Sequence, residues 1–128
     1  MDPTRQNAPR DATPSGNLPP RLPAELAALL RRLDADLAAL YGERYEGLVL
    51  YGSYARGDAD EGSDVDLLLL LGGEVDQARE VLRAEEVKWP LSLESGYALS
   101  LLPVGVETYR SSEDPFLWNA RREGIPAA

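Results

Sequence analysis

Residues 50–71 read LYGSYARGDADEGSDVDLLLLL, and they join two short apolar runs through a polar connection. The first run, GLVLYG at residues 47–52, is bounded by glycines, and the second, DVDLLLLL at residues 64–71, contains five consecutive leucines. Apolar runs of this length are typical of buried strands, and the glycine pair at residues 72–73 favours a strand over a helix. The segment therefore predicts two strands of one sheet, the second apolar on both faces and central.

Helical patterns lie on both sides of this pair of strands. Residues 23–41 place their leucines on one helical stripe, with Pro23 at the first position and Gly42 as the stop. Residues 75–88 predict a second helix, which Pro90 kinks or ends. The residues expected on its inner face are Val75, Ala78, Val81 and Leu82.

The last third of the chain predicts one more strand and one more helix. Residues 97–104 form the strand candidate, and Pro103 places its end near an edge of the sheet. The helix begins after Asp114 as N-cap and stops at Gly124. The residues that would anchor it are Phe116, Leu117 and Ala120. The order of elements predicts an α+β (mixed α/β) fold, in which helices cover a small mixed sheet.

Composition limits the classes of function that this chain can have. It has 128 residues, of which 44% are hydrophobic, which is enough for one small domain with a core. Lys and Arg number 13 against 22 Asp and Glu, and the net charge of −9 argues against direct nucleic-acid binding. Cys and His are absent, which excludes disulfides, Cys-ligated zinc and His chemistry and suits a cytoplasmic protein.

The N-terminal segment differs in composition from the rest. Residues 1–22 are rich in proline and predict a disordered tail, which leaves residues 23–128 as the domain. The tail has no apolar centre of the kind that a signal peptide has. No apolar run approaches the roughly 18 residues of a membrane span, so no membrane association is expected.

Two acids, Asp64 and Asp66, stand at the start of the leucine strand. Residues two apart in a strand point to the same face, so these carboxylates are expected to project together. Two ionised carboxylates this close repel unless a cation lies between them, and Mg²⁺ fits best where phosphates complete its shell. Gly52 and Ser53 end the preceding strand, where exposed amides and a hydroxyl can bind phosphate, and Arg56 can offset its charge.

These residues carry a resemblance to a known family. Gly52-Ser53, ten residues, then Asp64-Val65-Asp66 resembles the signature of the minimal nucleotidyltransferases, in the polymerase-beta-like nucleotidyltransferase superfamily. The similarity extends to GSYARGDADEGSDVDLLL and, further on, to LSLESGYALSLLPV and DPFLWNARREGIP, and so covers roughly residues 25–126. It implies that Gly52 and Ser53 hold the phosphates of a nucleoside triphosphate and that Asp64 and Asp66 bind Mg²⁺.

The resemblance also implies a reaction and a partner. The implied reaction transfers a nucleoside monophosphate to a hydroxyl group, with Asp64 and Asp66 as catalytic residues. The first candidate for the transferred group is AMP, taken from ATP. Small family members resemble the antitoxin half of toxin–antitoxin pairs, whose partner is a helical HEPN-type protein. The acceptor is then a protein such as that toxin, and oligomers are possible.

One expected acid of this family is missing. A third carboxylate usually stands on the next strand, but residues 97–104 contain no Asp or Glu, and Ser100 occupies its place. The nearest candidates are Glu94 and Glu107, both outside the predicted strand. The alternative to an enzyme is therefore a catalytically weak or inactive antitoxin, which neutralises its partner by complex formation.

Several residues near the motif have two possible roles. Arg56 either contacts phosphate or forms a salt bridge to Asp58 or Asp60. Tyr51 and Tyr54 either stack on a base or, as we expect, pack in the core or cover the loop. The two tryptophans, Trp89 and Trp118, are predicted to lie in the core.

Overall fold

The computed structural model describes residues 22–127. The elements are α1 (Ala24–Tyr41), a 3-10 turn (Gly42–Arg44), β1 (Tyr45–Tyr51), α2 (Ser53–Arg56), β2 (Val65–Leu71), α3 (Gln77–Ser95), β3 (Leu99–Gly105), α4 (Val106–Ser111), α5 (Pro115–Glu123) and β4 (Ile125–Pro126). No helix within this range is both long and apolar enough to span a membrane. The predicted tail at residues 1–22 lies outside this range except for Leu22, which is buried.

The four strands form one mixed sheet in the order β3-β2-β1-β4. β1 and β2 are antiparallel, β2 and β3 are parallel, and the short β4 pairs antiparallel with Val49 and Leu50 of β1. β2 lies between β1 and β3, which confirms the prediction of a central leucine strand and explains why both of its faces are apolar. The predicted α+β fold is therefore confirmed.

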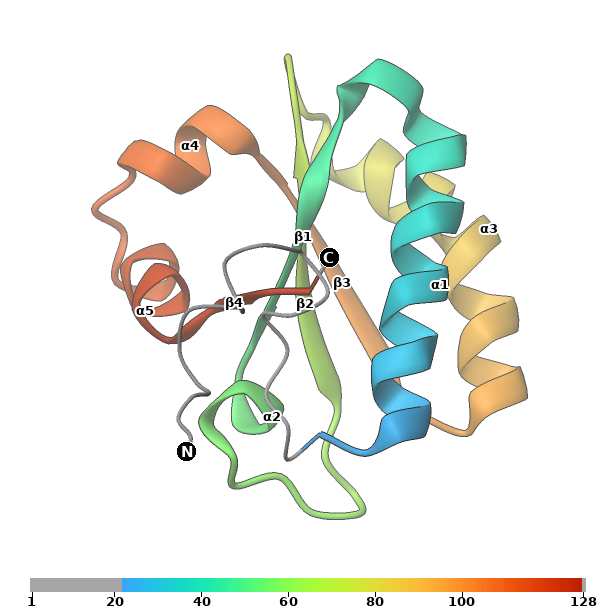
Figure 1. Cartoon of the computed structure of the whole chain (residues 1–128). Helices are drawn as coiled ribbons and strands as arrows, with labels where there is room; N and C mark the ends of the chain where they lie inside the picture. Colours follow the sequence, from blue (N-terminus) through green and yellow to red (C-terminus); the bar gives the residue numbers. More distant parts are fainter. Residues whose placement is uncertain (1–21, 128) are drawn as a thin grey trace, which may run out of the picture.

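Helices cover both faces of the sheet (Figure 1), with α1 and α3 on one side and α4 and α5 on the other. The leucines of β2 contribute to two hydrophobic cores because successive side chains of a strand point to opposite faces of the sheet. Leu67, Leu69 and Leu71 pack with α1 in the larger core, whereas Leu68 and Leu70 pack with α4 and α5 in the smaller one. The α4/α5 side is therefore the side toward which the even-numbered residues of β2 point.

The prediction for α3 was wrong in its length and in its buried face. Pro90 lies inside the helix, which continues to Ser95. The buried residues are Glu80, Ala84 and Leu91, whereas Ala78 and Val81 are exposed and Leu82 is 73% exposed. Of the predicted inner face only Val75 packs against the core, and it lies before the helix begins. On this face the Glu80 carboxylate accepts a hydrogen bond from Arg44 Nη1 at 3.0 Å, a contact between distant parts of the chain.

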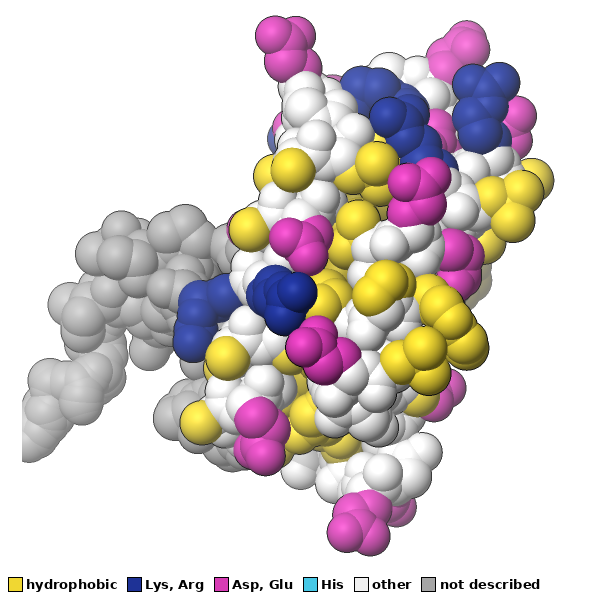
Figure 2. Space-filling view, turned by 90° about the vertical axis from the view of Figure 1, so that its right-hand side faces the viewer, with side chains coloured by type: hydrophobic (Ala, Val, Ile, Leu, Met, Phe, Trp, Pro, Cys, Tyr) yellow, Lys and Arg dark blue, Asp and Glu magenta, His cyan; other side chains and the backbone are white. Residues whose placement is uncertain are grey.

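The outer face of α3 carries large apolar side chains, some of which are visible as yellow groups on this side of the molecule (Figure 2). They are Val81, Leu82, Trp89 and Leu93. Trp89 is 56% exposed and Trp118, on α5, is 47% exposed. The prediction that both tryptophans lie in the core was therefore wrong.

The C-terminal helix follows its sequence signals. The Asp114 side chain accepts hydrogen bonds from the backbone of the first turn, and Leu117 and Ala120 are buried, as predicted. Phe116, the third predicted anchor, is 44% exposed and contacts the Tyr51 ring edge-to-face. α4 and β4 were not predicted, because each is too short to show a periodic pattern.

β3 is an edge strand, as Pro103 predicted. Pro103 has no N–H group, and its carbonyl oxygen accepts a hydrogen bond from Gln77 Nε2 at 2.6 Å. The edge is therefore partly closed by a side chain of α3.

Candidate active site

The Gly52-Ser53 turn joins the end of β1 to the first residue of α2. Gly52 has φ +79°, which favours glycine, and a Cβ added there would collide with the Asp66 carboxylate. The backbone angle and the lack of space for a Cβ therefore both require glycine. The second constraint shows that this turn lies directly against the Asp66 carboxylate of β2.

Asp66 lies at the end of the sheet where β1 finishes. Its neighbours in the strands on either side are Tyr51 of β1 and Ser100 of β3. It stands two residues before Leu68, so it faces the side of α4 and α5. Burial, and then the nearby charge of Asp64, raises the pKa of the Asp66 carboxyl above its ordinary value, while Arg56 acts in the opposite direction.

Asp64 is positioned differently. β2 begins at Val65, so Asp64 lies in the loop immediately before the strand, where it is exposed. It remains close enough to Asp66 for its charge to affect that carboxyl. The predicted pair therefore consists of one half-buried strand residue and one exposed loop residue.

Arg56 ends α2 on the same side of the molecule. Its Nε donates to Asp58 Oδ2 at 3.3 Å, and its Nη1 donates to Glu123 Oε1 at 3.0 Å. Of the alternatives considered for Arg56, the salt bridge to Asp58 is present, whereas Asp60 accepts hydrogen bonds from Gly62 and Ser63 within its own loop. The Glu123 contact was not predicted, because 67 residues separate the two side chains and no local pattern signals it.

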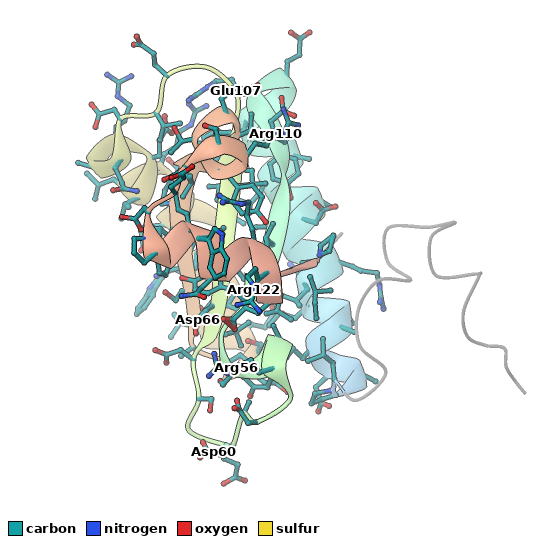
Figure 3. All side chains as sticks on the ribbon, turned by 90° about the vertical axis from the view of Figure 1, so that its left-hand side faces the viewer. Arg56, Asp60, Asp66, Glu107, Arg110 and Arg122 are labelled. Atoms are coloured by element: carbon teal, nitrogen blue, oxygen red, sulfur yellow. The ribbon has the colours of Figure 1, made fainter. Side chains whose placement is uncertain are left out.

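Neither candidate for the third carboxylate reaches this site. Glu94 forms an ion pair with Arg32 of α1, at the opposite face of the sheet. Glu107 pairs with Arg110 on α4, and both lie at the far end of the sheet from Asp66 and Arg56 (Figure 3). Ser100 is the direct neighbour of Asp66 on β3, the position where the family resemblance places an acid.

The two tyrosines that flank the turn are packing residues here. Tyr51 contacts Phe116 of α5, with the ring centroids 5.5 Å apart. Tyr54 packs against the larger core and contacts Tyr97 edge-to-face. These contacts agree with the expectation that both rings pack rather than project freely into solvent.

The donor set suits a hard cation that keeps other ligands. Within residues 22–127 no group of three or more His, Cys, Asp or Glu side chains could enclose a metal ion. Mg²⁺ is commonly held by one or two carboxylates together with substrate phosphates, and Asp64 with Asp66 beside the Gly52 turn fits that pattern.

Known proteins resemble this chain in sequence and in fold. A curated relative from Methanocaldococcus jannaschii, a "Putative protein adenylyltransferase", is 38% identical over 47 residues. This match covers 37% of the present chain and 48% of the relative, so the chain matches about half of that protein's length. A chain from a crystal structure of a toxin–antitoxin with AMP-PNP has a similar fold, with a TM-score of 0.56 and 18% identity, covering 80% of this chain and 72% of that one.

A longer sequence match shows the family to which this chain belongs. The model of the nucleotidyltransferase domain family matches residues 30–113, which include α2, the Gly52-Ser53 turn and both aspartates. This match spans well over half of the chain and contains the end of the sheet where those residues meet. The chain therefore belongs to the nucleotidyltransferase domain family.

Proposed function

We propose that this protein is a Mg²⁺-dependent nucleotidyltransferase that moves a nucleoside monophosphate, AMP from ATP, onto a hydroxyl group of a protein. The observation that carries the proposal is the close approach of Gly52 to the Asp66 carboxylate. This contact places a turn of the kind that binds phosphate next to a carboxylate that can bind a metal ion. A substrate made of a metal ion and a triphosphate requires both groups side by side. The adenylyltransferase relative supports AMP as the transferred group and a protein as the acceptor.

Each residue has a defined task in this proposal. Gly52 and Ser53 bind the β- and γ-phosphates, Arg56 offsets their negative charge, and Asp64 and Asp66 hold Mg²⁺. The bound ion would neutralise the triphosphate and stabilise the leaving pyrophosphate. The acceptor oxygen forms a bond to the α-phosphorus, the bond from that phosphorus to the β-phosphate oxygen breaks, and the hydroxyl proton passes to water.

The toxin–antitoxin neighbour and the family resemblance together suggest the acceptor. We propose a HEPN-type toxin as partner and the cytoplasm, where ATP is available, as the location. The chain carries no acid beside Asp66 on β3, and this favours a second candidate function. In that second candidate the protein is an inactive antitoxin, which neutralises its partner by binding alone.

The test is transfer of label from ATP in the presence of Mg²⁺ and the product of the neighbouring gene. Label on the α-phosphate is expected to reach the partner, whereas label on the γ-phosphate is not, because pyrophosphate leaves. Asp64→Asn and Asp66→Asn should each abolish transfer, while Glu61→Gln, which removes an exposed carboxylate from the same loop, should not.

The two candidate functions give different results in this experiment. If the partner is bound and neutralised but no α-label is transferred, the enzyme proposal fails and the binding function stands. If Asp64→Asn with Asp66→Asn abolishes neutralisation while the complex persists, binding alone is excluded.

A further inference from the structure

The last turn of α5 reaches the end of the sheet where Gly52 and Asp66 meet. No sequence signal indicates this approach. Arg56 Nη1 lies 3.0 Å from Glu123 Oε1 on α5, and Arg56 Nε lies 3.3 Å from Asp58 Oδ2. A guanidinium group held by carboxylates on two of its nitrogens has a defined plane and direction. Arg56 is nevertheless 50% exposed, so its remaining donors can face a ligand.

Glu123 is the more rigid of these two partners. It directly precedes Gly124, where an added Cβ would lie 2.6 Å from Val49 Cγ1 and would collide with the Ala120 carbonyl oxygen. The chain then enters β4, which pairs with Val49 and Leu50 of β1. Since β1 leads directly into Gly52, the same strand lies next to both Glu123 and the phosphate-binding turn. Asp58, in contrast, lies in an exposed loop.

We propose that Glu123 is a positioning residue of the nucleotide site, which holds the Arg56 guanidinium beside the Gly52-Ser53 turn for contact with a triphosphate. This inference rests on the proposed function and names a residue that this function does not itself require. Glu123 acts through Arg56, whose Nη1 engages the Glu123 carboxylate at 3.0 Å, and no group of three or more His, Cys, Asp or Glu side chains in the described part of the chain is arranged to hold a metal ion.

The negative charge of the protein explains why a fixed Arg56 guanidinium would favour nucleotide binding. The chain carries a net charge of −9, and Asp58, Asp64, Asp66 and Glu123 all lie in or beside this site. The positive charge of Arg56 therefore helps an anionic substrate to bind, but its long side chain loses conformational freedom whenever it binds. Holding the guanidinium in place beforehand reduces that loss at the moment of binding.

The alternative is an ion pair that contributes only to stability. Pairs between partly exposed side chains contribute little to folding, so a purely structural role predicts at most a small effect on stability and none on nucleotide affinity. The chain contains a matched control, since Glu107 pairs with Arg110 at 3.3 Å at the far end of the sheet. Glu107→Gln removes the same charge and the same type of contact away from the site.

The experiment measures the dissociation constant of Mg·ATP by calorimetry for the full chain and its variants. Glu123→Gln is expected to weaken binding roughly 2- to 10-fold, the range for freeing one long side chain. Glu123→Asp should fall between Glu123→Gln and the unmodified protein, and Glu107→Gln should match the unmodified protein. In an Arg56→Ala background, Glu123→Gln should cause no further loss, since it acts through Arg56.

Several results would overturn the inference. Equal affinities for Glu123→Gln and Glu107→Gln would make the pair purely structural, and tighter binding by Glu123→Gln would make Glu123 a competitor of the nucleotide. An equal loss with and without Arg56 would mean that Glu123 acts by another route. Each of these leaves the proposed function intact, whereas no Mg·ATP binding by the unmodified protein would refute the proposed function and this inference together.

Discussion

Replacing Arg44 with methionine would leave a carboxylate without its cation inside the protein. Glu80 is 2% exposed, its Oε2 accepts a hydrogen bond from Arg44 Nη1 at 3.0 Å, and its Oε1 has no hydrogen-bond partner among the described residues. Removing one member of a buried ion pair costs about 3–5 kcal/mol, because the remaining charge stays buried and unpaired. Small domains are stable by only about 5–15 kcal/mol, so Arg44→Met should remove a large fraction of this protein's free energy of unfolding.

The opposite change should cost much less. In Glu80→Met the Arg44 side chain remains partly exposed to water and keeps its hydrogen bonds to the carbonyl oxygens of Gly72 and Glu74. We expect a loss of about 1 kcal/mol, the size of one ordinary hydrogen bond. The double variant should be more stable than Arg44→Met alone, since two apolar side chains often replace a buried pair without loss.

The assay is urea-induced unfolding followed by far-UV circular dichroism, because both tryptophans are half exposed and are weak reporters of the core. The expected order of free energies of unfolding is unmodified protein first, then Glu80→Met and the double variant, with Arg44→Met lowest. An Arg44→Met variant within about 1 kcal/mol of the unmodified protein, or a double variant as unstable as Arg44→Met, would refute the reasoning.

Two further predictions concern the site. Asp66→Asn should raise the melting temperature at pH 7 but not at pH 3. Burial and the charge of Asp64 raise the pKa of the Asp66 carboxyl in the folded protein. The contribution of this carboxyl to stability is therefore present below its ordinary pKa and is lost as the pH rises through its pKa in the folded protein. A lower melting temperature for this variant at pH 7, measured by thermal unfolding, would contradict that sign. Gly73→Ala should lose about 1–2 kcal/mol in urea unfolding, since φ is +77° and the added Cβ meets nothing within 4 Å. Gly52→Ala should lose more, since φ is +79° and the added Cβ also collides with the Asp66 carboxylate, and only this variant should weaken Mg·ATP binding. Equal nucleotide affinities for the two alanine variants would show that contact with Asp66 does not matter.

Local sequence patterns were sufficient for the centre of this fold. The leucine run at residues 67–71 is short, is followed by two glycines and is apolar at every position, and these properties belong to a strand buried on both faces. The capping signals Asp114 and Gly124 were also local, and both ends of α5 followed them. The positions of Gly52 and Asp66 at one end of the sheet followed from the short connection between neighbouring strands.

The features that the sequence could not reveal depend on distant contacts. An apolar Leu82 predicts an inner face, but α3 buries Ala84, Leu91 and the Glu80 carboxylate, which Arg44 binds from a distant part of the chain, and Leu82 faces solvent. Pro90 is tolerated within the helix although proline usually ends or kinks one. Glu123 approaches Arg56 from α5, which packs on the sheet just before β4 pairs with β1, and neither contact leaves a local sequence pattern to detect.

The hydrogen bond from Gln77 to Pro103 has a consequence for how copies of this protein meet at high concentration. An open strand edge offers alternating donors and acceptors, on which a strand from another molecule can build a larger sheet. On β3 the proline offers no donor, and the Gln77 amide already occupies its carbonyl oxygen. An incoming strand would find this position closed, so sheet-to-sheet growth toward fibrous aggregates is discouraged at the β3 edge of the sheet.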